Sequence, residues 1–454
     1  LVVVNVNPLY TARELKHQLK DSGARSIVIL ENFAHILEEV IADTDIDHVV
    51  TTGLGDLLSF PRSSITNLMM RHVKKAVPAY RFARSTPLRK ALKKGAGRKL
   101  KDIELGFADI AYLQYTGGTT GVSKGAMLSH RNMVYNVQQT ITWQGDVYDD
   151  VDQVVAITAL PLYHIFSLEG NCLSVMALGG ENVLITNPRD FEGFAKEIAK
   201  HKFNLFTGVN TMFASLMHTP SFDKIDFSEL KVSIGGGMAV QPAVAKEWKQ
   251  KTGQAILQGY GLTETSPVAI CCVVGEEFTG TIGLPVPSTD VMIAGDDGNE
   301  LGLGEIGEIC IKGPQVMEGY WQRPKETAEV MLPGGWLRTG DVGRMDDDGY
   351  VWIEDRKKDM ILVSGFNVYP NEIENVVVEL DGVLEAAAIG IPDERSGEVV
   401  KIFAVRKNEL LTEQDILDHC KENLTGYKRP KAVEFRDELP KTNVGKILRR
   451  ALRE

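Results

Sequence analysis

The chain has 454 residues, of which 43% are hydrophobic and 24% are charged, and its formal net charge is −11. This length indicates two or three domains of a globular enzyme, since one hydrophobic core rarely organises so many residues. The five cysteines are an odd number and include no C-x-x-C pair, which argues against a disulfide framework or a zinc site and fits a reducing cytosol. No apolar run is long enough to span a bilayer.

The first third of the chain contains apolar runs and one basic segment. Residues 1–6 and 26–30 are predicted to be strands, the first of them buried. Residues 57–101 contain no acidic residue, and apolar residues recur at three-to-four spacing over 65–80. This pattern predicts an amphipathic basic helix that ends near Pro78. Two interpretations stay open: the helix packs its apolar face on the protein, or it lies on anionic lipid headgroups. No nucleic-acid partner is expected, because the rest of the chain is acidic.

The middle of the chain alternates strand-like and helix-like stretches. Strands are predicted at residues 154–157 and 182–185, with a long apolar helical stretch between them. Such alternation is typical of α/β layers with largely parallel sheets. Residues 280–352 change to short strands with frequent turns, which predicts an antiparallel barrel or a distorted sheet. Residues 355–359 are predicted to form a polar linker.

The last hundred residues are predicted to form a small independent α+β domain. Pro370 suits the first position of a helix, and Thr412 can cap another. Strands are predicted between these helices at residues 386–390 and 401–405.

A glycine- and threonine-rich segment, residues 115–125, is the most informative motif. Its glycines let backbone N–H groups converge on one anion, while its threonines and a lysine add hydroxyl donors and a positive charge. The segment therefore predicts a phosphate cradle. It is not a kinase-type P-loop, because it lacks the Gly-Lys pair followed by Ser or Thr. The residues assigned to the cradle are Thr116, Gly117, Gly118, Thr119, Thr120, Gly121 and Lys124.

Four further motifs can bind parts of a nucleotide. Residues 259–265 offer an aromatic ring, a hydroxyl and a carboxylate, which can stack on a purine, bond a phosphate and hold Mg²⁺. Residues 335–341 end in an aspartate that can accept ribose hydroxyls. Residues 355–359 add an arginine, and residues 440–447 add a lysine near the C-terminus.

In this order, the motifs resemble the adenylate-forming superfamily of acyl-CoA synthetases, luciferases and peptide-synthetase adenylation domains. Within it, the chain is most similar to bacterial long-chain fatty acid–CoA ligases. Four segments also resemble the corresponding sequences of these ligases: residues 160–166, 313–317, 336–374 and 364–370. The resemblance covers the whole chain and implies a further stretch before residue 1, so we expect an N-terminally truncated ligase.

The resemblance implies a fold class and a reaction. The fold class is α/β, with a large N-terminal AMP-binding domain of layered sheets and a β-barrel-like subdomain (1–355), followed by a small mobile α+β C-terminal domain (356–454). The reaction is the ATP-dependent conversion of a long-chain fatty acid to an acyl-adenylate with release of pyrophosphate. Transfer to coenzyme A follows, at a cytoplasmic location with peripheral contact to the inner face of an anionic membrane. A homodimer is left open.

The resemblance also assigns roles to residues. Lys446 bridges the carboxylate and the α-phosphate, Thr263 contacts the α-phosphate, and Glu264 holds Mg²⁺. His164 lies near the acyl carboxylate. The remaining assignments are Gly235, Gly236 and Tyr260 around adenine, Asp341 and Arg356 on ribose, Lys358 at the hinge, and Gly365 beside the pantetheine arm of coenzyme A.

Two departures and two rival functions accompany this hypothesis. The family often has Ser at the position of Gly118 and Pro at that of Ser123, and residues 165–169 lack a tryptophan that gates the acyl tunnel in some relatives. An aryl or medium-chain CoA ligase would use the same machinery. A binding protein that holds nucleotide but turns over poorly is the other rival, although retention of Lys446 argues against it.

Overall fold

The computed structural model describes residues 1–116, 123–393, 395–442 and 445–453. The chain divides into two compact units. The first comprises residues 1–130 with 320–322, and the second comprises residues 131–319 with 323–454. Mixed helices and strands in both units confirm the α/β fold class.

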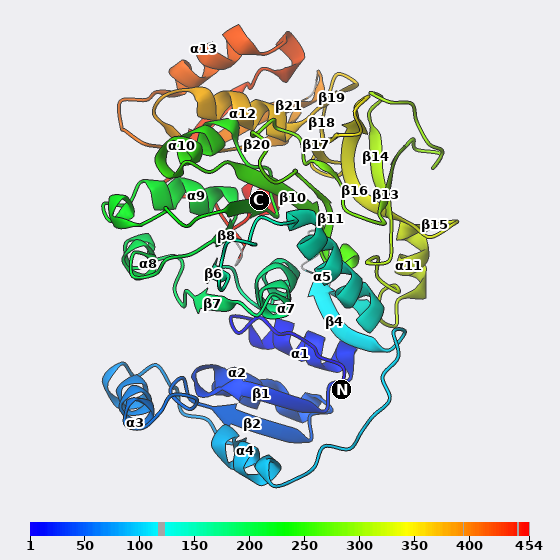
Figure 1. Ribbon diagram of the computed structural model, residues 1–454. Helices are drawn as coiled ribbons and strands as arrows, with labels where there is room; N and C mark the ends of the chain where they lie inside the picture. Colours follow the sequence, from blue (N-terminus) through cyan, green and yellow to red (C-terminus); the bar gives the residue numbers. More distant parts are fainter. Residues whose placement is uncertain (117–122, 394, 443–444, 454) are drawn as a thin grey trace. The chain divides into compact units, whose positions relative to one another are not determined.

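The first unit contains a parallel three-stranded sheet in the order β1-β2-β3 (Figure 1). Helices α1 and α2 pack on it through Leu19, Leu37 and Val49. An antiparallel pair, β4–β5, belongs to the same unit. The bounds are α1 (Ala12–Ser22), β1 (Ser26–Leu30), α2 (Ala34–Val40), β2 (His48–Thr52), α3 (Arg62–Leu68), β3 (Thr86–Pro87), α4 (Leu88–Ala96), β4 (Ile110–Thr116) and β5 (Lys124–Ser129).

Two predictions for this unit need correction. Residues 1–6 do not form a buried strand, because only Val3 forms a bridge, to Tyr112, and residues 1–3 are exposed. The basic helix is shorter than predicted: α3 continues as a π-helical turn, Met69–Val73, and ends there. Beyond it the chain turns through Lys75, whose φ is +50°, and Tyr80 donates a hydrogen bond to Glu31 (2.8 Å).

The second unit contains a seven-stranded sheet in the order β12-β11-β10-β9-β8-β6-β7. Strands β7, β6, β8, β9 and β10 are parallel, whereas β11 and β12 are antiparallel additions. The strands are β6 (Val155–Thr158), β7 (Glu181–Leu184), β8 (Leu205–Gly208), β9 (Val232–Gly236), β10 (Ile256–Gly261), β11 (Val268–Cys271) and β12 (Leu284–Pro285). Both strands predicted in this region are confirmed to within one residue.

Helices cover both faces of this sheet (Figure 1). On one face Phe206 packs with Phe213 and Trp248 of α9 and α10. On the other face Leu205 packs with Val175 of α7. Strand residues alternate between the two apolar clusters, which is the pattern of a sheet buried on both sides. The helices are α5 (His130–Gln144), α6 (Ile165–Ser167), α7 (Ser174–Ala177), α8 (Phe191–Ile198), α9 (Asn210–Met217) and α10 (Pro242–Thr252).

An antiparallel sheet follows, as the turn-rich sequence predicts. Its order is β13-β14-β16-β15, and β17 pairs with the ten-residue strand β16. Of the two alternatives, these pairings describe an irregular sheet with register shifts in β14 and β16. Its elements are β13 (Asp290–Ala294), β14 (Gly307–Lys312), α11 (Pro324–Val330), β15 (Met331–Leu332), β16 (Trp336–Met345) and β17 (Val351–Arg356).

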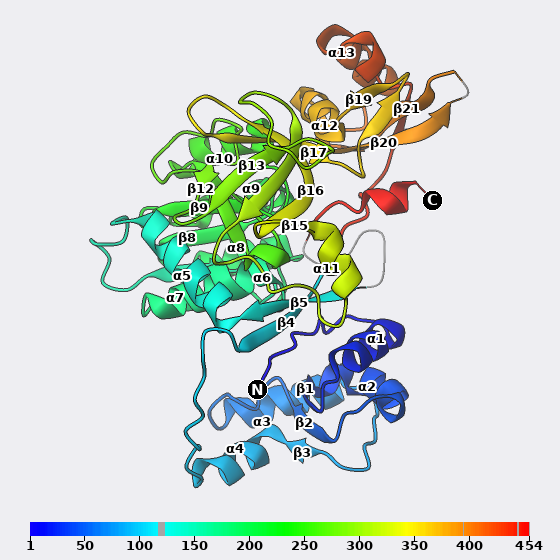
Figure 2. The same cartoon turned by 90° about the vertical axis from the view of Figure 1, so that its right-hand side faces the viewer.

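The C-terminal residues form a five-stranded sheet, β19-β18-β21-β20 with β22 beside β21, and α12 and α13 pack on it (Figure 2). Pro370 occupies the first turn of α12, and Thr412 caps α13 in a capping box, as predicted. The bounds are β18 (Ile361–Val363), β19 (Phe366–Val368), α12 (Pro370–Glu379), β20 (Val383–Asp393), β21 (Gly397–Arg406), α13 (Glu413–Asn423) and β22 (Ala432–Phe435).

The predicted polar linker is wrong at its first two residues. Asp355 and Arg356 are the last residues of β17, and the Asp355 side chain is only 1% exposed. Its carboxylate accepts a hydrogen bond from the backbone N–H of Asn371 (2.8 Å) and lies 3.8 Å from Arg449. One acid in this charged run, Asp355, is therefore buried, because residues far along the chain supply its partners.

Candidate active site

Three predicted nucleotide-binding residues meet in the second unit, at the ends of β10 and β17 and in the middle of β16. The Tyr260 hydroxyl donates a hydrogen bond to Asp341 (2.7 Å), and Arg356 Nε lies 3.3 Å from the other carboxylate oxygen. Asp341 is 3% exposed. Each carboxylate oxygen keeps a second lone pair beyond these contacts, so Asp341 can still accept hydrogen bonds from hydroxyl groups.

Lys446 lies on a loop that closes on itself through backbone hydrogen bonds. Leu448 N donates to Pro440 O (2.8 Å), and Thr442 N donates to Lys446 O (2.7 Å). We call residues 440–448 the Lys446 loop; residues 443 and 444 lie outside the described part. The loop is held against α9 by a hydrogen bond from the Thr211 hydroxyl to Gly445 O (3.1 Å).

The Lys446 side chain lies over the end of β9. A Cβ atom on Gly237 would stand 2.9 Å from Lys446 Cε, so the bare glycine backbone leaves the space that the lysine fills. Burial lowers the pKa of Lys446 to about 8, and Arg356 acts in the same direction. The carboxylates of Asp341 and Glu264 oppose this shift. Lys446 thus stays mostly protonated at pH 7, beside two acids and a second cation.

His164 caps α6 and accepts a weak hydrogen bond from Phe166 N (3.4 Å) through Nδ1. Burial and the nearby charge of Lys446 lower the pKa of His164 to about 3, so its imidazole is neutral at pH 7. The Phe166 ring packs on Gly236, where an added Cβ would lie 3.0 Å from a ring carbon. A Cβ atom added to Gly235 would instead lie 2.5 Å from a side-chain carbon of Val240.

Thr263 and Glu264 lie in a single 3₁₀ turn, Thr263–Thr265, directly after β10. The Glu264 carboxylate is near enough to influence Lys446. Among the residues that the structure describes, no cluster of three or more His, Cys, Asp or Glu side chains could hold a metal ion. A single carboxylate nevertheless fits Mg²⁺, because this ion is commonly bound by one or two carboxylates together with substrate phosphates.

The phosphate cradle belongs to the first unit. Thr116 and Lys124 face each other at the end of the β4–β5 pair, and the Ser123 hydroxyl donates to Thr116 O (2.7 Å). The Lys124 ammonium lies 4.9 Å from the centre of the Tyr320 ring. The other five assigned residues lie outside the described residues: Gly117, Gly118, Thr119, Thr120 and Gly121.

One predicted residue, Gly365, does not join the cluster around Lys446. Gly365 lies in the exposed two-residue turn between β18 and β19, where its φ is +83° and that of Ser364 is +51°. A Cβ there would meet no atom within 4 Å, so the positive φ rather than crowding favours glycine. Lys358, in the turn after β17, is near enough for its charge to lower the pKa of Lys446, and burial with Arg356 lowers its own pKa.

Sequence reasoning missed the residues that hold these groups in place. Gly237 extends the assigned pair Gly235 and Gly236, a signal that could have found it, whereas Thr211 lies in no motif and only its contact with the Lys446 loop reveals it. Arg449 follows that loop and binds Glu374 through two nitrogen atoms (2.8–3.1 Å). No sequence signal short of the fold itself distinguishes Arg449 from its exposed neighbour Arg450.

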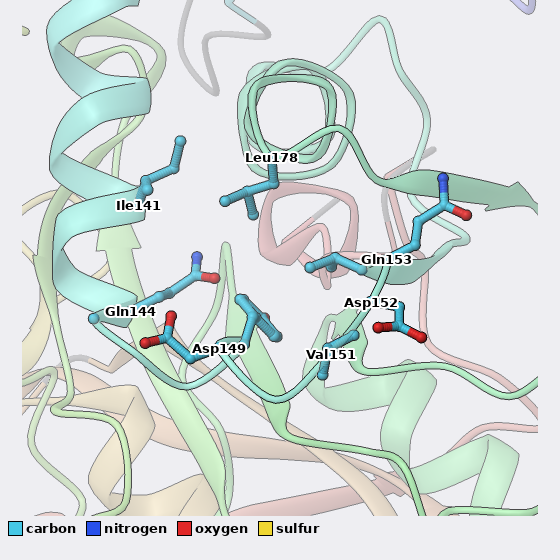
Figure 3. Close-up of a pocket in the computed structure, with 10 residues that line it drawn as sticks. Ile141, Gln144, Asp149, Val151, Asp152, Gln153 and Leu178 are labelled. Carbon is cyan, nitrogen blue, oxygen red and sulfur yellow. The ribbon is translucent and has the colours of Figure 1, made fainter.

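A separate cavity of about 180 Å³ lies beside the C-terminal end of α5 (Figure 3). Ile141 and Gln144 of α5, Leu178 after α7, and the loop residues Asp149 and Asp152 line it. None of the predicted site residues lines this cavity, so it is not part of the candidate site.

Comparisons with known proteins show what the whole chain is similar to. Residues 1–321 match the family described as "AMP-binding enzyme", and residues 372–446 match "AMP-binding enzyme C-terminal domain". The chain is 53% identical to a long-chain-fatty-acid–CoA ligase of Salmonella typhimurium, over all of this chain and 81% of that protein.

More distant proteins extend the likeness. A Bacillus subtilis protein of the same name is 38% identical over all of this chain and 81% of its own length. The crystal structure of ATP-bound MatB from Rhodopseudomonas palustris superposes with a TM-score of 0.82 at 30% identity. That alignment covers all of this chain and 83% of the other.

Proposed function

Because this chain belongs to the family of AMP-binding enzymes, we propose that it is an AMP-forming ligase that joins a long-chain fatty acid to coenzyme A. The observation that carries the proposal is the position of Lys446 beside Asp341, Arg356 and Glu264. Cations and hydroxyl-binding acids gathered at one place suit a nucleotide whose phosphates must be neutralised. The identity to the Salmonella typhimurium ligase supports the choice of acid.

In the first half-reaction, a carboxylate oxygen of the fatty acid attacks the α-phosphorus of ATP. The bond between the α-phosphorus and the bridging oxygen breaks, and pyrophosphate leaves with the electron pair. The protein need not supply a nucleophile: it positions two anions and stabilises the charge that develops between them. Lys446 stabilises that negative charge, while Asp341 and Arg356 hold the ribose and Tyr260 borders the adenine.

Other residues complete the binding of ATP. Thr263 contacts the α-phosphate, and Thr116 and Lys124 steady the β- and γ-phosphates together with the cradle residues between them. Glu264 would hold Mg²⁺, which when bound neutralises phosphate charge. His164, being neutral, can lie near the acyl carboxylate without forming an ion pair that would hold it back from reaction.

In the second half-reaction, the sulfur of coenzyme A attacks the acyl carbon, the thiol loses its proton, and AMP leaves. Lys446 occupies the site in this structure, so it must withdraw before the pantetheine arm can enter. We place a domain boundary between residues 355 and 356, with Lys358 as the pivot of a mobile C-terminal domain. Rotation there would bring the exposed Gly365 turn toward the site.

We propose that the protein contacts a membrane surface peripherally, where its poorly soluble fatty acid substrate is available. The segment 57–101 exposes Leu57 (77%), Phe60 (84%), Leu68 (61%) and Val73 (72%). The apolar face of the basic helix is therefore not covered by the described residues of its own unit, and it can insert into a bilayer surface. Among the described residues, no helix combines the length and apolarity that crossing a membrane requires.

The direct test mixes the protein with ATP, Mg²⁺, palmitate and coenzyme A, and follows pyrophosphate and thioester separately. We expect both products, with palmitate preferred to octanoate and benzoate. Preference for benzoate or octanoate would instead favour the aryl or medium-chain rival. Tight ATP binding without pyrophosphate release would favour a binding protein.

A further inference from the structure

A buried ion cluster joins the base of the Lys446 loop to both sides of the proposed pivot. Arg449 is the first residue after the loop and is 16% exposed. It donates hydrogen bonds to Glu374 (2.8–3.1 Å) and to the Asn371 side chain (2.9 Å), both on α12. The remaining nitrogen, Nη1, lies 3.6 Å from Asp359 and 3.8 Å from Asp355.

Only one member of this cluster lies before Lys358 in the chain. Asp359, Asn371, Glu374 and Arg449 all follow the pivot, so their mutual contacts would survive a rotation there. Asp355 precedes it and accepts a hydrogen bond from the first turn of α12, at Asn371 N (2.8 Å). The contacts that Asp355 makes with Asn371 and Arg449 therefore cross the pivot and would break on rotation.

The same geometry ties the cluster to catalysis. Arg449 is three residues from Lys446, and the Lys446 loop that it follows is closed by its own backbone hydrogen bonds. Fixing Arg449 therefore fixes the point from which Lys446 reaches over Gly237. We propose that Asp355 and Arg449 are positioning residues that hold the Lys446 loop in place for the first half-reaction and separate when the C-terminal domain rotates.

A contribution to folding stability does not explain why an acid is buried at position 355. Burial, opposed by Arg449 and helped by Glu374, raises the pKa of Asp355 to about 6. A carboxyl whose folded-state pKa is raised stabilises the fold while protonated and loses that contribution as pH rises through about 6. The ionised form is thus a cost to the fold at neutral pH, as buried ion pairs often are.

The proposal rests on the proposed function, so its test compares the two half-reactions within one protein. Asp355→Asn keeps the shape but removes the negative charge and leaves one acceptor oxygen for the contacts with Asn371 N and Arg449. Arg449→Lys keeps the charge but not the two-pronged contact with Glu374. Arg450→Lys, at the exposed neighbour, is the matched control. Pyrophosphate exchange into ATP measures the first half-reaction, and thioester formation from supplied palmitoyl-adenylate measures the second.

We expect Asp355→Asn and Arg449→Lys to slow the first half-reaction about tenfold, with the second unchanged or faster. Arg450→Lys should change neither. Equal losses in both half-reactions, or values that match the control, would overturn the proposal. A wild-type protein without ligase activity would instead count against the proposed function.

The pH profile supplies a second readout that a purely structural role would not move. Above about pH 6 the Asp355 carboxylate is ionised and holds Arg449; below it, the contact weakens. The charged groups that act on Asp355 are Arg449 and Glu374, and Asp359 shares Arg449 with it. Wild-type protein should therefore lose first-half activity as pH falls through about 6, and Asp355→Asn should lack this limb. An identical acid limb in that variant would contradict the proposal, even if the Arg449 variant failed to fold.

Discussion

Lys446 brings a positive charge to the proposed site from a segment far beyond Asp341 and Arg356 in the chain. Its charge is needed where the carboxylate meets the α-phosphate, and the thiol attack that follows has no comparable requirement. We expect Lys446→Ala to reduce pyrophosphate exchange at least a hundredfold while leaving thioester formation from supplied acyl-adenylate within about twofold of wild type. Lys421→Ala, an exposed lysine on α13, is the control; a parallel loss of both half-reactions would remove Lys446 from this role.

The lowered pKa of Lys446 gives an alkaline limb with a defined sign. Because only protonated lysine is cationic, kcat/KM for ATP in the first half-reaction should fall above about pH 8, approaching tenfold per unit. Lys446→Arg keeps its charge throughout this range and should abolish the limb, whatever its effect on the maximum. If the limb persists in that variant, another group is titrating. His164, with its pKa near 3, adds no limb between pH 5 and 8.

At single positions, the sequence predicted residue types better than their surroundings. Tyr260, Asp341 and Arg356 were each assigned to the nucleotide, and they meet although 81 positions separate the first two. Only the family resemblance placed them together, since spacing alone does not encode contacts across sheets. The run of charged residues predicts that Asp355 belongs to a polar linker. Its burial depends on Asn371 and Arg449, which local sequence cannot reveal.

At the scale of elements, the turn after β17 is the proposed pivot. The amide hydrogens of Lys357 and Asp359 donate to Gly340 O (3.0 Å) and Arg356 O (2.9 Å), whereas that of Lys358 has no partner among the described residues. Lys358→Pro thus removes no hydrogen bond of this state but restricts φ to about −65°. We expect near wild-type pyrophosphate exchange and a loss of thioester formation.

Lys358→Ala serves as the control for that variant, because it removes the side chain but leaves the backbone free to rotate. It should retain both half-reactions. Normal thioester yield in Lys358→Pro would show that rotation occurs elsewhere.

Elements with strong local signals were predicted well. Thr412 and Pro370 mark helix starts through capping and fixed φ, and both helices begin there. The basic helix was predicted too long, since its periodic apolar residues continue past Val73 while the backbone turns at Lys75. Apolar residues 1–6 show the same limit, because a strand needs a partner strand and only Val3 finds one.

At the scale of the whole molecule, the acidic chain carries a basic, apolar segment. Lys74, Lys75, Lys93 and Lys94 are all exposed, and each cation near an anionic surface contributes about 1 kcal/mol. Changing these four lysines to glutamate should release the protein from phosphatidylglycerol vesicles, while activity on detergent-dispersed palmitate persists. Flotation with vesicles at low and high salt measures the binding.

A matched control reverses four exposed lysines elsewhere, so that the change in net charge is equal; they are Lys202, Lys251, Lys325 and Lys421. This variant should still bind. Similar release of both variants would mean that net charge, not the segment, governs attachment. A wild-type protein that ignores the vesicles even at low salt would end the membrane proposal.

The position of Lys446 beside His164 has one more consequence. Its charge is one of the two influences that keep the imidazole neutral, and it sits on a loop that leaves the site if the domain rotates as proposed. The electrostatic potential that Lys446 produces at His164 would then alternate within every turnover. It would be strongly positive while pyrophosphate is being displaced, and weaker once pyrophosphate has gone. The basicity of His164 would rise and fall in step with it, so a ¹⁵N-labelled imidazole could serve as a built-in clock of the catalytic cycle.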